Sequence, residues 1–108
     1  MYKIWTDNVC LGESDLEMFD ESMNVRSGRF SPLQPYWQVR SVFRLFSQAL
    51  EMQGASRTQA LEKYYSARDR LGLSLRDNVG SPVSVGEIHI IDVNESDDDL
   101  RIEVYPPK

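Results

Sequence analysis

The spacing of apolar residues along the chain predicts two helices in its middle, with strands on either side. Pro35 is suited to the first turn of a helix, where its missing backbone donor costs nothing. Gly54 is expected to end this helix. A capping-box match at Ser56 and Gln59 predicts the start of a second helix, and Gly72 is expected to cap its end. The predicted buried stripe of the first helix consists of Val39, Val42, Phe43, Phe46, Ala49 and Leu50.

The N-terminal residues predict a short β-hairpin followed by a brief helix. Residues 2–5 and 9–11 are rich in β-forming side chains, and the Asp7-Asn8 pair between them is typical of a turn. Ser14 and Glu17 then match a capping box, in which the two side chains satisfy free backbone donors at a helix start. About one turn of helix is expected here.

The remaining segments predict further strands. Residues 23–30 alternate loosely, and Gly28 indicates a bulge or a close backbone approach. After a strand at 73–75 and a turn rich in Asp, Asn, Gly and Pro, residues 83–93 predict one long strand with a bulge at Gly86. A last strand with one buried face is predicted by the alternating apolar residues Leu100, Ile102 and Val104.

Together these elements predict a single α+β domain over residues 1–108, with two central helices packed on one face of an antiparallel sheet. The chain has 41% apolar and 27% charged residues, the balance of a folded globule. Cys10 is the only cysteine, so no intrachain disulfide is expected. With no signal-peptide pattern and no long apolar run, a cytoplasmic location and no membrane association are expected.

Charge divides the chain into three zones. Residues 1–23 carry one base and six acids, residues 24–76 nine bases and three acids, and residues 77–108 two bases and eight acids. The acidic ends are expected to fold back on the basic middle and partly neutralise it. The alternative is that one acidic zone forms an exposed face for a basic partner.

Few residues are available for catalysis or for holding a metal. His89 is the only histidine and lies between two isoleucines, and Cys10 lies in an apolar segment where a thiol acts as a small hydrophobe. An EF-hand-like count from Asp92 to Glu103 is misleading because its sixth position is Asp97 instead of the required Gly. No zinc spacing and no phosphate-binding glycine loop is present. We therefore expect no enzyme activity, no metal and no cofactor.

Direct nucleic-acid binding is also not expected. It would rest on basic residues of the middle zone and two aromatic residues beside them, but the sequence pI near 4.8 opposes phosphate. Trp37 and Tyr65 lie off the centres of their helical stripes, and one of them is a candidate for exposure to a partner. The residues in question for nucleic acid are Arg26, Arg29, Arg40, Arg44, Tyr36 and Trp37.

One stretch of the chain carries a family resemblance. The residues that carry it are Gly12, Ser14, Leu16, Glu17, Glu21-Ser22-Met23, Val25, Gly28, Phe30, Pro32 and Tyr36. This stretch, roughly a quarter of the chain, resembles a segment of small bacterial proteins, some of which resemble immunity proteins that neutralise polymorphic or contact-dependent toxins. The resemblance implies a protein partner and no catalytic positions.

The leading hypothesis is a cytoplasmic immunity-type inhibitor that covers the basic surface of a toxin domain. A compact acidic protein associates quickly with such a surface through complementary charge. The alternatives are a phage-type inhibitor that mimics nucleic acid and a small enzyme that uses His89 or Cys10. The oligomeric state is left open. The candidate partner-binding residues form two acidic clusters: Glu13, Asp15, Glu17, Asp20 and Glu21, or Asp97, Asp98 and Asp99.

Overall fold

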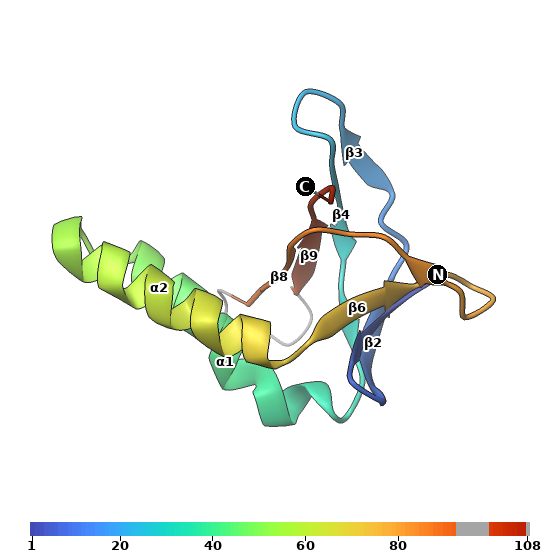
Figure 1. The fold of residues 1–108 in the computed structure, drawn as a ribbon, viewed down its shortest axis with the longest axis horizontal. Coiled ribbons are helices and arrows are strands. Elements are labelled where there is room, and N and C mark those ends of the chain that lie inside the picture. Colours follow the sequence, from blue (N-terminus) through green and yellow to red (C-terminus); the bar gives the residue numbers. More distant parts are fainter. Residues whose placement is uncertain (93–99, 108) are drawn as a thin grey trace.

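The computed structural model describes residues 1–92 and 100–107, which form two antiparallel sheets and a pair of helices. The predicted α+β class, with helices packed against the sheet, is confirmed. The strands, however, form two sheets and not one. Figure 1 shows the helix pair extending to one side of the body and the β3–β4 hairpin extending upward from it.

The first sheet has five strands in the order β5-β2-β1-β6-β7. Its β1–β2 pair is the predicted hairpin, with Asp7 at a positive φ of 50° in the turn. The β6–β7 turn also lies where the sequence predicts it, and the Asp77 carboxylate accepts backbone hydrogen bonds from Val79 and Ser81. The strands are β1 (Tyr2–Thr6), β2 (Val9–Ser14), β5 (Ser31–Pro32), β6 (Leu73–Arg76) and β7 (Pro82–Val83).

The second sheet has four strands in the order β3-β4-β9-β8. The predicted strand at 23–30 is present as β4, and the last strand buries one face as predicted. Gly28 is a point of close approach, because a Cβ there would lie 2.8 Å from Ser14 Oγ. The strands are β3 (Met18–Asp20), β4 (Val25–Arg29), β8 (Ile88–Ile91) and β9 (Arg101–Val104).

The helices are α1 (Tyr36–Leu50) and α2 (Gly54–Arg70). Pro35 directly precedes α1, and Gly72 follows α2 with a positive φ of 61°, both as predicted. Two boundaries differ: Gly54 begins α2, and Ser56 lies inside that helix without acting as a cap. No helix in the described ranges is long and apolar enough to cross a membrane.

Helix α1 packs on β8 and on α2, and the core lies between these elements and the sheets. Leu50 is an exception to the predicted stripe, since it is 47% exposed at the end of α1 where the helix pair extends beyond the sheets. The largest buried apolar side chains come from both helices and both sheets: Ile4, Leu11, Phe30, Tyr36, Phe43, Tyr64, Ile90, Leu100 and Ile102.

Two predicted elements are wrong. No helix follows Ser14, because this residue ends β2 and its hydroxyl accepts a hydrogen bond from the Leu16 N–H at 3.2 Å, with Leu16 at a positive φ of 49°. The long strand predicted at 83–93 is divided between the two sheets as β7 and β8. Gly86 lies in the link between them, where its N–H donates to the Tyr105 carbonyl at 2.9 Å.

Candidate functional site

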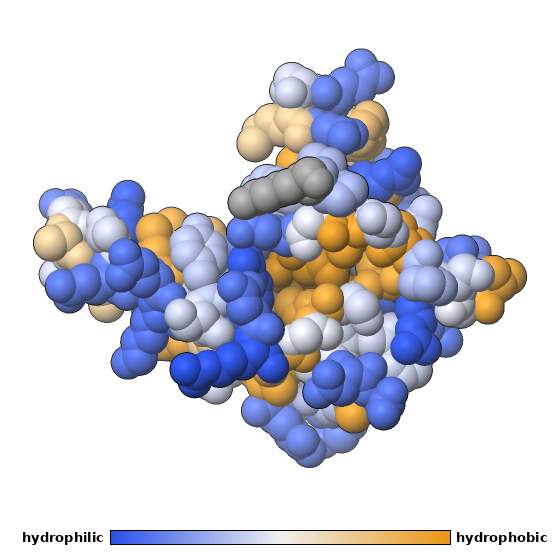
Figure 2. Space-filling model, viewed as in Figure 1, coloured by the Kyte–Doolittle hydropathy of each residue, from blue (hydrophilic) through white to orange (hydrophobic). Residues whose placement is uncertain are grey.

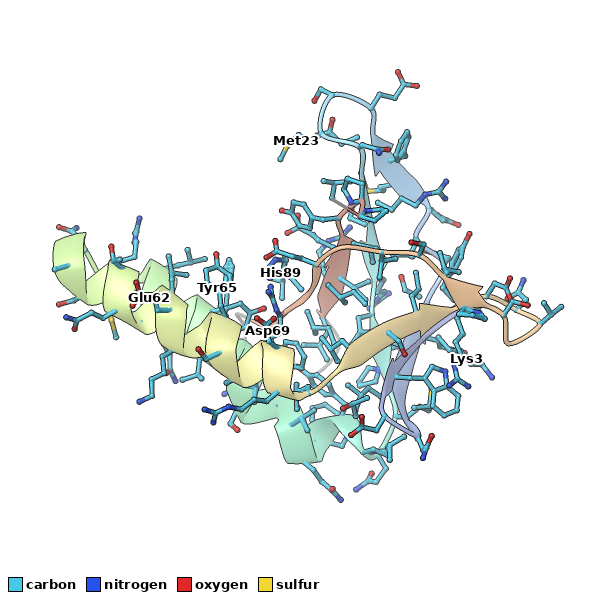
Figure 3. The ribbon with its side chains drawn as sticks, viewed as in Figure 1. Lys3, Met23, Glu62, Tyr65, Asp69 and His89 are labelled. Atoms are coloured by element: carbon cyan, nitrogen blue, oxygen red, sulfur yellow. The ribbon has the colours of Figure 1, made fainter. Side chains whose placement is uncertain are left out.

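The β3–β4 hairpin carries exposed apolar and acidic side chains side by side. Met18 is 60% exposed, Phe19 49% and Met23 58%. Figure 3 shows Met23 on this hairpin, away from the helices and the first sheet. Large apolar side chains grouped on a projecting surface are typical of an interaction site. We define the hairpin surface as Glu17, Met18, Phe19, Asp20, Glu21 and Met23.

The turn of this hairpin is ordered by Asp20. Its carboxylate accepts hydrogen bonds from the Ser22 hydroxyl at 2.6 Å and the Ser22 N–H at 3.0 Å. Asn24 takes a positive φ of 56°, a conformation that Asn tolerates better than most residues. The hydrogen bond from the Ser22 hydroxyl lowers the pKa of Asp20 from its usual value. The hairpin surface therefore keeps this negative charge at mildly acidic pH.

Basic side chains of the second sheet hold the apolar residues of the hairpin in place. The Arg26 guanidinium lies over the Phe19 ring, 5.4 Å from its centroid, and these two residues are partners in the β3–β4 register. The Arg101 guanidinium lies 3.7 Å from the Met18 sulfur. Strand β3 is the outer strand of its sheet, and all three of its residues remain exposed despite these contacts.

The structure brings together only part of the predicted binding face. Glu17, Asp20 and Glu21 lie on the hairpin, and Asp15 is exposed just before it. Glu13 lies apart from them on β2, opposite Lys3 of β1 in the first sheet. The second predicted cluster, Asp97, Asp98 and Asp99, lies outside the described residues.

Sequence reasoning missed the apolar half of the hairpin surface. The available signal was the Met-Phe pair at 18–19 between acidic residues, followed by Met23 and Asn24. The false capping-box match at Ser14 assigned this stretch to a helix. Read as an Asp-to-Asn turn between two strands, the same residues would have placed the acids and the apolar side chains on one hairpin.

His89 forms a second, mostly buried polar cluster where α2 meets the second sheet. Its Nδ1 lies 2.9 Å from the Tyr64 hydroxyl, and its Nε2 lies 3.1 Å from an Arg68 nitrogen. Arg68 also pairs with Glu87 at 3.2 Å. Figure 3 shows His89 beside the Tyr65 and Asp69 end of α2.

Burial and the Arg68 charge lower the pKa of His89 from its usual value, so the ring is neutral at neutral pH. Burial also raises the pKa of Tyr64 to about 12. Burial opposes ionisation of Glu87, but the hydrogen bond and charge of Arg68 outweigh it, and the pKa of Glu87 is lowered. The cluster thus has a neutral histidine beside a compensated ion pair.

The structure does not bring Cys10 and His89 together. Cys10 lies on β2 of the first sheet, and its thiol is 3.6 Å from the Gly12 carbonyl oxygen. His89 lies on β8 of the second sheet, and its two ring nitrogens contact groups on α2.

The residues considered for metal and nucleic-acid binding have structural contacts. Asp92, the first position of the EF-hand-like count, is buried and binds Arg40 at 2.7 Å, while positions 94–98 lie outside the described residues. The described residues contain no group of three or more His, Cys, Asp or Glu side chains able to hold a metal. Tyr36 is fully buried and cannot stack on a base, whereas Tyr65 is 39% exposed, as expected for one of the two off-stripe aromatics.

No protein-family model matches the chain, and no curated protein and no solved structure is found to match it.

Proposed function

We propose that this protein is a non-catalytic binding module of the immunity type, which uses the hairpin surface to cover a basic surface on a toxin domain. The observation that supports this function is the grouping of Met18, Phe19 and Met23 with Glu17, Asp20 and Glu21 on one projecting hairpin. The segment also carries part of the resemblance to immunity proteins described above.

The two kinds of side chain have different roles in this proposal. Apolar anchors that become buried in an interface supply most of the binding energy, and Phe19 with its methionine neighbours is the obvious source. The surrounding carboxylates steer a basic partner toward the hairpin and raise the association rate. Removing the anchors should therefore affect dissociation, and removing the charges should affect association.

The mixed composition also favours a protein partner over mimicry of nucleic acid. An inhibitor that imitates a phosphate backbone needs a face of regularly spaced carboxylates, whereas this hairpin places acids next to large apolar groups. A duplex oligonucleotide that failed to displace the protein from its partner would agree with this choice.

The test is coexpression with the product of the adjacent upstream gene, scored by growth and by binding kinetics. In the Phe19→Ser/Met23→Ser variant we expect dissociation at least about tenfold faster and loss of growth rescue. In the Glu17→Gln/Glu21→Gln variant we expect slower association and a weaker dependence on salt.

Matched controls carry the same changes elsewhere on the exposed surface. Met52→Ser/Val79→Ser removes two exposed apolar side chains, and Glu51→Gln/Glu62→Gln removes two exposed acids, one just after α1 and one on α2. Both controls should bind like the wild type. A neighbouring product that is neither toxic nor bound, or a partner that binds the hairpin variants unchanged, would overturn the proposal.

A further inference from the structure

A pocket of about 250 Å³ lies between the two sheets, and one of its lining residues, Tyr105, also contacts the His89 ring. Figure 2 shows apolar side chains in a hollow near the middle of this face of the molecule. Tyr2 and Leu75 belong to the first sheet, and Arg26 and Val104 to the second. Most of the other lining side chains are apolar: Leu16, Val83, Val85, Pro106 and Pro107.

The walls of this pocket are held in place by backbone hydrogen bonds. Gly86 N–H donates to the Tyr105 carbonyl at 2.9 Å, and Tyr105 N–H donates to the Glu87 carbonyl at 2.9 Å. These bonds tie the β7–β8 link, which includes Val85, to the end of β9. The pocket is therefore formed before any ligand binds, as is usual for small-molecule sites.

Among the described residues that line the pocket, Arg26 is the one charged residue. In the described part of the chain its guanidinium has no carboxylate within ion-pair distance and contacts the Phe19 ring. The Tyr2 hydroxyl, also in the lining, has no hydrogen-bond partner among the described residues. An open pocket that combines apolar side chains with an uncompensated cation and a free hydroxyl is complementary to an anion that carries an apolar body.

We propose that this pocket binds a small organic carboxylate with an apolar tail, with Arg26 holding the carboxylate. At the ~30 Å³ that one water occupies in the liquid, the pocket has room for about eight non-hydrogen atoms. The aliphatic tail lies against the valine and leucine side chains from both sheets. This site goes beyond the proposed partner binding and does not depend on it.

Hexanoate, which has eight non-hydrogen atoms, is the probe, and hexanamide is its uncharged match. Titration followed by two-dimensional NMR should give saturable shifts at residues of the pocket with hexanoate, and binding at least about tenfold weaker with hexanamide. Arg26→Gln should weaken hexanoate binding by at least about tenfold, while Arg29→Gln, on the same strand but outside the pocket lining, should leave it unchanged.

A second variant keeps the proposal testable if Arg26→Gln disturbs the hairpin. Val85→Phe fills the cavity from the β7–β8 link and should abolish the hexanoate shifts while the rest of the spectrum is retained. Absence of saturable shifts in the wild type, equal binding of the acid and the amide, or equal losses in Arg26→Gln and Arg29→Gln would overturn the proposal.

Discussion

Asp92 is the most completely buried charged residue in the described part of the chain. Its carboxylate accepts hydrogen bonds from the Tyr36 hydroxyl and from Arg40, each at 2.7 Å, and lies 3.5 Å from Arg44. The Ser47 hydroxyl donates to its carbonyl at 2.9 Å. A buried carboxylate is tolerated only when it is paired and hydrogen-bonded in this way. Asp92 thus fixes the end of β8 to one face of α1.

Replacing Asp92 by Asn tests this role. Asn keeps the size of the side chain but removes the negative charge that pairs with Arg40 and Arg44, so we expect the free energy of unfolding to fall by about 2 kcal/mol. Tyr36→Phe removes one hydroxyl donor to the carboxylate and should cost about 1.5 kcal/mol. Urea unfolding of the two variants measures both values, and an Asp92→Asn protein as stable as the wild type would contradict the assignment.

Burial explains why the sequence suggested the wrong roles for Asp92, Arg40 and Tyr36. Asp92 stood out only as the start of a calcium-like count, and Arg40 and Tyr36 only as candidates for nucleic acid. Their real contacts join positions more than fifty residues apart. Local spacing along a chain carries no information about such pairs, which depend on how β8 is placed against α1.

Strand β5 packs against β2 only because residue 12 is glycine. A Cβ at this position would lie 2.5 Å from both the Phe30 ring and the Ser31 carbonyl oxygen. We expect Gly12→Ala to lower the free energy of unfolding by about 2–3 kcal/mol, since either the core ring or the backbone of β5 must move.

Gly80→Ala is the matched control for the glycine at position 12. Gly80 has a positive φ of 84° with nothing within 4 Å of the added Cβ, so only backbone strain of about 1 kcal/mol is expected. Thermal or urea unfolding compares the two variants. Equal losses of unfolding free energy in the two variants would show that the close packing of β5 against Gly12 does not account for the cost of Gly12→Ala.

Elements with a strong local signal were predicted well. The helical stripe after Pro35, the first hairpin and the β6–β7 turn all have side chains whose periodicity or turn preference is decisive. Strand β3 was missed because its three residues are all exposed and so show no alternation. The Ser14 match failed because its hydroxyl caps a turn two residues ahead and not a helix.

The division into two sheets could not be predicted from the sequence, because it depends on a link at 84–87 that interrupts an apparently continuous strand.

The charge zones did predict one long-range property. Arg40 and Arg44 of the basic middle zone pair with Asp92, and Arg68 pairs with Glu87. These two C-terminal acids therefore fold back on the basic middle zone as expected. Part of the N-terminal acidic zone instead projects on the hairpin, where its apolar neighbours were found only in the structure.

The cluster around His89 joins the helix pair to the second sheet, so its titration affects the stability of the whole molecule. The ring meets groups from every element packed around it. These are Phe46 of α1, Tyr64, Tyr65 and Arg68 of α2, Glu87 of the β7–β8 link, and Glu103 and Tyr105 at β9. Burial and the Arg68 charge keep its pKa below the usual value, so folding excludes a proton that the unfolded chain accepts.

The stabilisation from neutral His89 is therefore complete above the unfolded pKa of about 6.5 and declines as the pH falls below it. Between about pH 7.5 and about pH 5.5 we expect the wild type to lose up to about 1.4 kcal/mol of unfolding free energy. Because His89 is the only histidine, the His89→Gln protein should show a nearly flat profile over this range. Urea unfolding at each pH measures both curves; parallel curves would mean that protonation of His89 is not linked to folding.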